Sequence, residues 1–177
     1  MLGVNFLEIK KKIKYLKLPK RRFEFRGQIN QRNIYDDYAH HPNEIKETIK
    51  LGRLFIKQKH NNDSPKSRLI AIFQPHRYSR VNQFAKEFAN ELSKADVIYV
   101  TSIYAAGEEN KDKITSKIIT DLIYKQNKNV SYVKNYYVIT HNFYELTQKG
   151  DLILNMGAGD CDNFWSILNE KNNKISD

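Results

Sequence analysis

Cysteine is almost absent from this sequence, with Cys161 the single example among 177 residues. One thiol cannot form an internal disulfide, which excludes the disulfide-stapled scaffolds of small secreted proteins. Long apolar runs are also absent, because none approaches the roughly 20 residues that a helix needs to cross a bilayer. Near the start, lysines follow a short apolar piece, which is the reverse of a secretory signal. These absences predict a cytoplasmic protein with no membrane partner.

Negative charge is in the minority, since 20 Asp and Glu stand against 30 Lys and Arg, for a net charge of +10. Such an excess raises the question of nucleic-acid binding, because clustered cations neutralise phosphates. The main cluster is confined to residues 10–26, however, and the other lysines are scattered through amphipathic segments. This pattern is typical of a solvated basic surface, and we expect no nucleic-acid partner.

The length fits a single domain, and 40% hydrophobic residues, with 9 Phe, 11 Tyr and 1 Trp, are enough to build a core. Residues 1–20 resemble the end of a helix followed by a basic connector, with Pro19 stopping the helix. We therefore expect the domain itself to occupy residues 21–177.

The hydrophobic pattern changes period repeatedly along the chain. Short apolar or β-rich runs predict strands at 30–36, 69–73, 97–101, 130–133 and 152–156. Helical spacing predicts helices that begin at Pro42 and cover 81–92, 114–123 and 161–168, while 138–146 is ambiguous and 61–66 is expected to be a surface loop. Alternating strands and helices predict an α/β fold, a Rossmann-like, open, mostly parallel sheet with helices on both faces. In such sheets ligands bind at the carboxyl ends of the strands.

The segment DDYAHHP, residues 36–42, follows the first predicted strand. Two carboxylates and two imidazoles within six residues could ligate a metal. Asp37 could instead accept hydrogen bonds from ribose hydroxyls, as acidic residues do in nucleotide-binding α/β folds. Asp36 and His41 could also serve only in the turn and the helix cap. The residues by themselves leave all three interpretations open.

The segment QPHRYSR, residues 74–80, lies between a predicted strand and a predicted helix. Arg77 and Arg80 are three residues apart, so both could face one side of a first helical turn. Two guanidinium groups beside a helix N-terminus suit a carboxylate or a phosphate. An ion network with Asp36 or Glu108 is the structural alternative, and the anion site is the favoured interpretation.

Two further segments are less specific. RRFEFRG, residues 21–27, could grip a phosphate and an aromatic base, or could be one more part of the basic connector. GAGD, residues 157–160, offers small residues after a strand, which permit close backbone approach to a ligand. A GxG without a third glycine is a weak dinucleotide signal, so a tight turn is the default interpretation of this segment.

Taken in order, RRFEFRG, DDYAHHPNEI, FQPHRYSR, IYAAGE and GDLILNMGAGD are similar to the motif series in the C-terminal domain of UDP-N-acetylmuramate–L-alanine ligases, members of the Mur ligase family. The resemblance covers roughly residues 2–168. It implies a three-domain enzyme in which ATP phosphorylates the muramate carboxylate and the alanine amine attacks the acyl phosphate. Magnesium ions and a phosphate-binding lysine stabilise the phosphoryl charge, and the C-terminal domain closes on ATP and positions L-alanine.

The resemblance also implies roles for individual residues. Arg22 resembles the arginine that reaches the ATP phosphates, and Asp37 resembles the carboxylate that bonds the ribose. His40, Arg77 and Arg80 resemble the group around the incoming alanine, with the arginines holding its carboxylate. Further positions match the motifs and are expected to line the same cleft without an assigned role: Tyr38, His41, His76, Gly157, Ala158, Gly159 and Asp160. No residue is expected to ligate a metal, and none is assigned as catalytic.

The sequence contains no GxxxxGK[ST] or similar loop, so the central ATPase domain and the N-terminal UDP-binding domain of the family are both expected to be missing. The Mg²⁺ ligands would lie in those domains, and we expect the chain alone to be inactive in ligation. Two alternatives remain, a stand-alone module that binds a nucleotide or an amino acid, and a metal-dependent phosphoesterase built on Asp36, Asp37, His40 and His41.

Overall fold

The computed structural model describes residues 6–13, 19–59 and 67–176. The loop expected at 61–66 lies outside the described residues. Within them a six-stranded sheet has the order β1-β2-β6-β3-β4-β5. The strands are β1 (Glu24–Ile29), β2 (Arg32–Asp37), β3 (Leu69–Phe73), β4 (Val97–Val100), β5 (Val130–Tyr132) and β6 (Leu152–Met156). All neighbouring pairs are parallel except β1 with β2, which confirms the predicted open, mostly parallel sheet.

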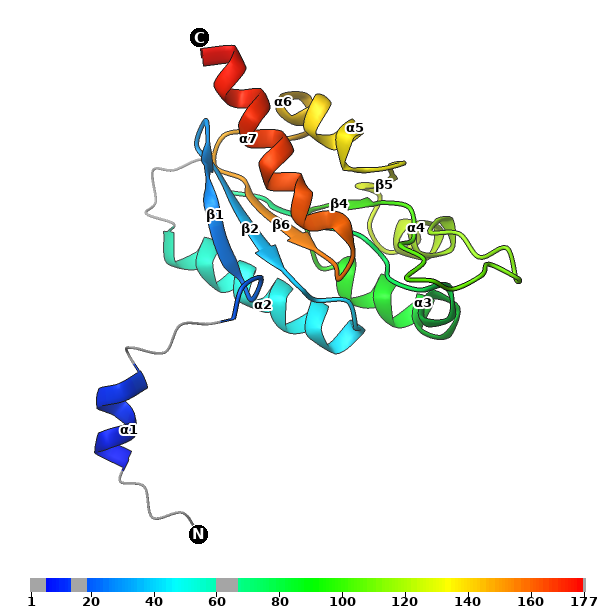
Figure 1. Ribbon diagram of the computed structural model, residues 1–177, viewed down its shortest axis with the longest axis horizontal. Helices are drawn as coiled ribbons and strands as arrows, with labels where there is room; N and C mark the ends of the chain where they lie inside the picture. The colour runs from blue at the N-terminus through cyan, green and yellow to red at the C-terminus, as the bar shows by residue number, and fades with distance from the viewer. Residues whose placement is uncertain (1–5, 14–18, 60–66, 177) are drawn as a thin grey trace.

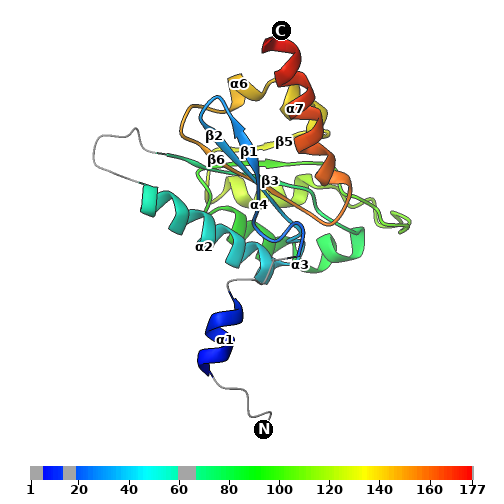
Figure 2. The same cartoon turned by 60° about the vertical axis from the view of Figure 1, so that its left-hand side comes forward.

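The central strands are apolar because both faces of the sheet are covered. β3 (LIAIF) and β6 (LILNM) are buried at every position, as expected for parallel strands between two layers of helices. One layer consists of α2 (Pro42–Lys59), α3 (Tyr78–Leu92) and α4 (Lys117–Tyr124). The other contains α5 (Tyr136–His141), α6 (Phe143–Leu146) and α7 (Asn163–Ser176). Figures 1 and 2 show the two layers on opposite sides of the sheet, each with its own buried apolar cluster, which confirms the prediction of helices on both faces.

The N-terminal helix predicted before Pro19 is present as α1 (Phe6–Ile13), which stands away from the sheet in both views (Figures 1 and 2). The ambiguous stretch at 138–146 is helical, in α5 and α6. The helix predicted from 161 begins as a short 3₁₀ turn, Asp160–Asp162, and continues as α7.

The edge strand β1 corrects the sequence interpretation. Residues 24–27 are not part of a connector, because they pair antiparallel with β2. The hairpin loop is Asn30-Gln31, and both residues have positive φ, 43° and 63°. This is the backbone handedness of the turns that two-residue hairpins favour. The predicted strand at 30–36 therefore begins two residues too early, inside the turn.

Candidate ligand-binding site at the carboxyl edge of the sheet

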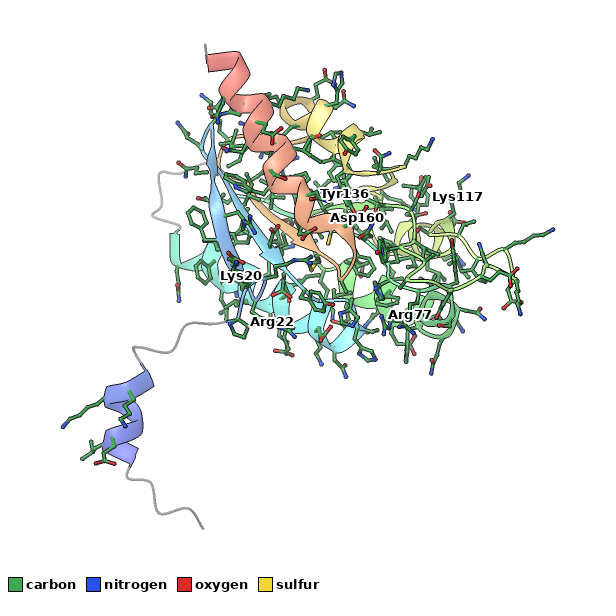
Figure 3. The ribbon with its side chains drawn as sticks, viewed as in Figure 1. Lys20, Arg22, Arg77, Lys117, Tyr136 and Asp160 are labelled. Carbon is green, nitrogen blue, oxygen red and sulfur yellow. The ribbon has the colours of Figure 1, made fainter. Side chains whose placement is uncertain are left out.

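Four sequence segments meet at one edge of the sheet. Strands β2, β3 and β6 end in register, since Asp37 and Phe73 both pair with Met156. The segments DDYAHHP, QPHRYSR and GAGD therefore leave the sheet side by side. RRFEFRG joins them because the antiparallel β1 begins at this edge. Figure 3 labels Arg22, Arg77 and Asp160 along it. This is the edge at which ligands bind in open α/β sheets.

The buried carboxylate of Asp37 joins the segments together. Its Oδ2 accepts the backbone N–H of Phe23 at 2.8 Å and its Oδ1 accepts that of Ala39 at 2.8 Å. Burial raises the pKa of Asp37, although these hydrogen bonds oppose the rise. The side chain is 7% exposed. Asp37 thus fixes the start of β1 against the end of β2, and ribose binding at this residue remains a prediction.

Asp36 points the other way and is fully buried. Its Oδ1 accepts from Asn155 Nδ2 at 2.9 Å, and Arg26 Nη1 lies 3.2 Å from its Oδ2 without hydrogen-bond geometry. Burial outweighs both neighbours and raises the pKa of Asp36 to about 6. Because Asp36 and Asp37 are each engaged by different protein partners, the contacts favour structural roles over a shared metal site. Among the described residues, no group of three or more His, Cys, Asp and Glu side chains is placed to hold a metal ion.

The raised pKa of Asp36 predicts a pH dependence of folding. A carboxyl group that holds its proton more tightly when folded stabilises the fold below the unfolded pKa, near 4, and this stability is lost as pH rises to about 6. In Asp36→Asn this loss should vanish. The free energy of unfolding, measured in urea, should therefore fall between pH 4 and pH 7 by on the order of 2 kcal/mol more in the parent than in the variant. A difference that does not change with pH would contradict the assignment.

The structure gives two adjacent arginines different surroundings. Arg21 Nη2 donates to the carbonyl of Gly157 at 2.6 Å and lies 2.9 Å from Cys161 Sγ, so this guanidinium joins β1 to the loop after β6. Arg22 instead has a side chain that is 46% exposed, and its nearest anion is Glu44 at 3.8 Å. Both guanidiniums face the ring of Tyr38, at 5.2 and 5.8 Å. Arg22 is therefore the arginine available to an incoming anion.

The residues after β2 form an ordered turn into α2. His40 Nδ1 lies 2.9 Å from the carbonyl of Tyr38 and 3.3 Å from Glu44 Oε2. Since both partners are acceptors, they assign the proton to Nδ1 and leave Nε2 of the neutral ring as an acceptor. His41 packs edge-on against Phe84 with ring centroids 5.0 Å apart. His41 thus contacts α3, whereas His40 faces the ligand edge, with its ring centroid 5.8 Å from that of His76.

His76 has the opposite arrangement of ring nitrogens. Its Nδ1 lies 3.2 Å from Arg80 Nη1, which can only donate, so the proton of the neutral ring is assigned to Nε2. Burial lowers the pKa of His76, and the charge of Arg80 lowers it further, which favours the neutral form. The ring stacks on Tyr104 with centroids 5.5 Å apart. Facing histidines therefore offer one acceptor, on His40, and one donor, on His76.

Arg77 and Arg80 both lie at the start of α3, as predicted. Arg77 precedes the helix with φ 73° and ψ 136°, a sparsely populated conformation for a non-glycine residue, held by a hydrogen bond from its N–H to the carbonyl of Tyr104 at 2.8 Å. Its guanidinium is half-exposed and 3.9 Å from Glu108. Glu108 mainly caps α3, because it accepts from the N–H and the hydroxyl of Ser79 at 3.0 and 2.6 Å. The loose pairing leaves Arg77 available to another anion.

The loop 157–160 closes this edge. Gly157 N donates to the carbonyl of Asp37 at 3.1 Å, and a Cβ on Gly159 would lie 2.4 Å from Gln74 Oε1. Asp160 Oδ1 accepts from Gln74 Nε2 at 2.8 Å and from the Tyr136 hydroxyl at 2.5 Å. Burial alone would raise the pKa of Asp160, but these hydrogen bonds hold it below its usual value. A pocket of about 240 Å³ beside them is lined by Gln74, Thr101, Ser102, Ile103, Tyr104, Ala105, Lys134, Asn135, Tyr136 and Asp160.

Sequence reasoning missed Glu44, Tyr104 and Tyr136, and it considered Glu108 only as an ion partner of the arginines. Glu44 could have been suspected as a helix cap, since it occupies the third position of the helix predicted from Pro42. Glu108 gave no such signal, because it caps Ser79 from 29 residues away. Tyr104 and Tyr136 gave no signal, because each belongs to the site only through contacts with residues more than twenty positions away.

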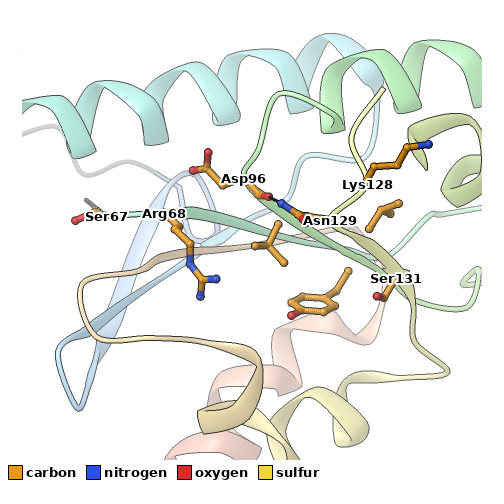
Figure 4. Close-up of a pocket in the computed structure, with 9 residues that line it drawn as sticks. Ser67, Arg68, Asp96, Lys128, Asn129 and Ser131 are labelled. Carbon is orange, nitrogen blue, oxygen red and sulfur yellow. Dashed lines mark hydrogen bonds between the residues drawn. The ribbon is translucent and has the colours of Figure 1, made fainter. Parts of the chain in front are cut away.

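A second pocket, of about 540 Å³, opens at the opposite, amino-terminal edge of β3, β4 and β5 (Figure 4). Its charged residues have structural partners. Arg68 forms two hydrogen bonds with Asp151, at 3.1 and 2.7 Å, and Asp96 accepts from Arg53. These contacts hold strand ends together, so we place the candidate site at the carboxyl edge.

No described helix is long and apolar enough to span a membrane. The chain is 66% identical over 173 residues to the UDP-N-acetylmuramate–L-alanine ligase of Prochlorococcus marinus subsp. pastoris, a match that covers 97% of the chain and 37% of that relative. The ligase of the same name from Caldanaerobacter subterraneus is 39% identical over 174 residues, covering 98% of the chain and 36% of the relative. The chain thus spans little more than a third of the length of these relatives.

Solved structures agree on the fold. The UDP-N-acetylmuramate–alanine ligase of Thermotoga maritima superposes with a TM-score of 0.74 at 23% sequence identity, over 99% of this chain and 35% of that one. The family described as Mur ligase, glutamate ligase domain, matches residues 21–159, which contain nearly all of the candidate site. On this match, the chain belongs to the Mur ligase family and corresponds to its glutamate ligase domain.

Proposed function

We propose that this chain is the C-terminal domain of an ATP-dependent ligase that joins L-alanine to UDP-N-acetylmuramate during peptidoglycan precursor synthesis. The observation that carries the proposal is the 66% identity, across 97% of the chain, to a ligase of that name. The chain spans 37% of that relative, which supports a requirement for the N-terminal and central domains of the family in ligation. The chain closes on the nucleotide and positions the amino acid.

The amino-acid end of the site has groups for both termini of alanine. Arg77 and Arg80 carry two positive charges toward a carboxylate, and the Nε2–H of His76 adds a neutral donor. His40 Nε2 is an acceptor for the amino group, whose nitrogen must lose a proton when it attacks the acyl phosphate. The two imidazole centroids are 5.8 Å apart, so both rings can contact one small amino acid. Holding the amine in place is the main catalytic contribution of this chain.

At the nucleotide end, the exposed guanidinium of Arg22 is suited to the ATP phosphates. The Asp37 carboxylate, which accepts the N–H of the next residue, Phe23, is the group suited to the ribose. Mg²⁺ would enter with ATP, and its remaining ligands would come from the domains that carry the nucleotide-binding loop. In the ligation step a C–N bond forms between alanine and the muramoyl carbonyl, the acyl–phosphate bond breaks, and inorganic phosphate leaves.

The test is product formation from UDP-N-acetylmuramate, L-alanine and ATP. The chain is assayed alone and then with a separately expressed N-terminal and central portion of the Prochlorococcus marinus ligase. We expect ligation only in the mixture. A folded chain that gives no product in either assay, but binds ATP or alanine saturably, would instead identify a stand-alone binding module.

The two adjacent arginines provide a specific prediction. In the reconstituted mixture, Arg22→Ala should raise the KM for ATP roughly tenfold, because one charge-assisted contact to phosphate is lost, and should leave the melting temperature unchanged. Arg21→Ala should lower the melting temperature, because the Gly157 carbonyl and Cys161 lose a buried partner. An equal effect of both substitutions on stability would contradict this division of roles.

A further inference from the structure

The carboxylate of Glu44 contacts two of the segments at this edge, DDYAHHP and RRFEFRG. Oε2 accepts the backbone N–H of His40 at 2.9 Å and that of His41 at 3.1 Å, and it lies 3.3 Å from His40 Nδ1. Oε1 lies 3.8 Å from Nη1 of Arg22. Burial raises the pKa of Glu44, but the hydrogen bonds from the His40 and His41 N–H groups, together with the charge of Arg22, outweigh burial and lower it.

Part of this arrangement is an ordinary helix cap. α2 begins at Pro42, so His41 is the residue before the helix and Glu44 occupies its third position. A glutamate there accepts the N–H of the capping residue, and a glutamine serves equally well in this motif. The cap explains the hydrogen bond from His41 and requires an acceptor but no charge.

The cap does not explain the contacts of Glu44 with the His40 ring and with the Arg22 guanidinium. The His40 ring and Arg22 come from different segments, and the proposed function gives them to different ligands, the amino acid and the nucleotide. Both also contact Tyr38, with His40 edge-on at 5.2 Å and Arg22 over the ring at 5.8 Å. The Glu44 carboxylate therefore lies between His40, assigned to the amino acid, and Arg22, assigned to the nucleotide. In the described contacts, it is the only negatively charged group that both side chains approach.

We propose that Glu44 is a positioning residue whose charge acts together with the Tyr38 carbonyl, 2.9 Å from Nδ1, to keep the proton of His40 on Nδ1 and to turn Nε2 toward the incoming amine. Glu44 also holds Arg22 near the phosphates. This inference rests on the proposed function. The effect of Glu44 on His40 should be larger than its effect on Arg22. Arg22 and Glu44 have side chains that are 46% and 34% exposed and lie 3.8 Å apart, a geometry in which ion pairs contribute little.

The test compares Glu44→Gln with Glu47→Gln. Glu44→Gln retains an acceptor for the cap and removes the charge. Glu47 is also a glutamate of α2, but it is exposed, and in the described contacts it pairs only with Lys50. The tautomer of His40 is read from ¹⁵N chemical shifts of the imidazole in the whole chain, and KM values are read from the reconstituted ligation.

For Glu44→Gln we expect the Nδ1-protonated tautomer of His40 to fall at least roughly twofold. The KM for alanine should rise roughly tenfold, the difference between a charge-assisted and a neutral hydrogen bond. The KM for ATP should change by less than roughly threefold. The melting temperature should match that of the parent, and Glu47→Gln should change none of these quantities.

Two outcomes would overturn the inference. If Glu44→Gln matches Glu47→Gln in tautomer and in KM, and only Glu44→Ala differs, Glu44 is a helix cap and nothing more. If the unsubstituted mixture does not ligate, the proposed function fails and the assignment of ligands to His40 and Arg22 fails with it. The tautomer measurement separates the two cases, since it needs no activity.

Discussion

Replacement of Arg80 by alanine should raise the KM for L-alanine about 100-fold in the reconstituted ligation, with a small effect on the KM for ATP. Arg80 is part-buried at the start of α3, and its Nη1 is 3.2 Å from His76 Nδ1. The substitution would remove a two-pronged partner of the carboxylate and also the donor that fixes the tautomer of His76. A 100-fold loss corresponds to about 2.7 kcal/mol, within the range for a charge-assisted pair that loses one partner.

Lys86→Ala is the matched control, because Lys86 lies on the same helix, carries the same charge and is exposed. It should leave both KM values unchanged. Arg80→Lys separates charge from geometry, since lysine keeps the charge and lacks the fork, and an intermediate KM is expected. If Arg80→Ala raises the KM for ATP and spares that for alanine, the guanidinium serves the nucleotide and the two ends of the proposed site are exchanged.

Gly27→Ala should destabilise the fold by about 3 kcal/mol, from overpacking together with backbone strain. Gly27 lies at the irregularity of β1, with φ 156°, and an added Cβ would meet Trp165 of α7 at 2.3 Å. The loss should lower the melting temperature by roughly 6–12 °C for a chain of this size. Because Trp165 is the single tryptophan, its fluorescence would report both the clash and the unfolding.

Gly107→Ala is the control that measures backbone strain without a side-chain clash. Gly107 also has a positive φ, 82°, but a Cβ there would meet nothing within 4 Å. Its substitution should cost only about 1 kcal/mol. The double variant Gly27→Ala, Trp165→Leu should recover part of the loss if the ring is the obstacle. Equal destabilisation by the two glycine substitutions would show that Trp165 moves aside freely.

Much of the fold follows from local pattern. The runs LIAIF and LILNM are apolar at nearly every position because they are covered on both faces, and this made β3 and β6 visible in the sequence. β1 was hidden for the opposite reason. It is an edge strand with exposed positions, and its turn uses Gln31 at positive φ in place of the glycine that marks such hairpins.

The sequence indicated the edge of the sheet where the candidate site lies, but not the side-chain contacts within it. The rule that ligands bind after parallel strands pointed to the segments that the structure brings together at this edge. The motif resemblance singled out Arg22, but its physical difference from Arg21 was not visible in the sequence, because that difference depends on Gly157, 136 residues from Arg21. The same holds for Asp36 and Asp37, whose carboxylates turn to different neighbours only once β1 and β6 flank β2.

The direction of β1 has a mechanical consequence. Because this strand runs antiparallel to the others, the chain enters the sheet at the carboxyl edge, and Arg22 lies two residues before the strand begins. A domain attached through Pro19 would therefore transmit its movement to the chain next to Arg22, the proposed phosphate contact, through only a few residues. The backbone on either side of Arg22 is anchored, because the Arg21 carbonyl accepts the N–H of Tyr38 and the Asp37 carboxylate accepts the N–H of Phe23. A rotation of such a domain would therefore bend the chain before residue 21 and leave Arg22 in place.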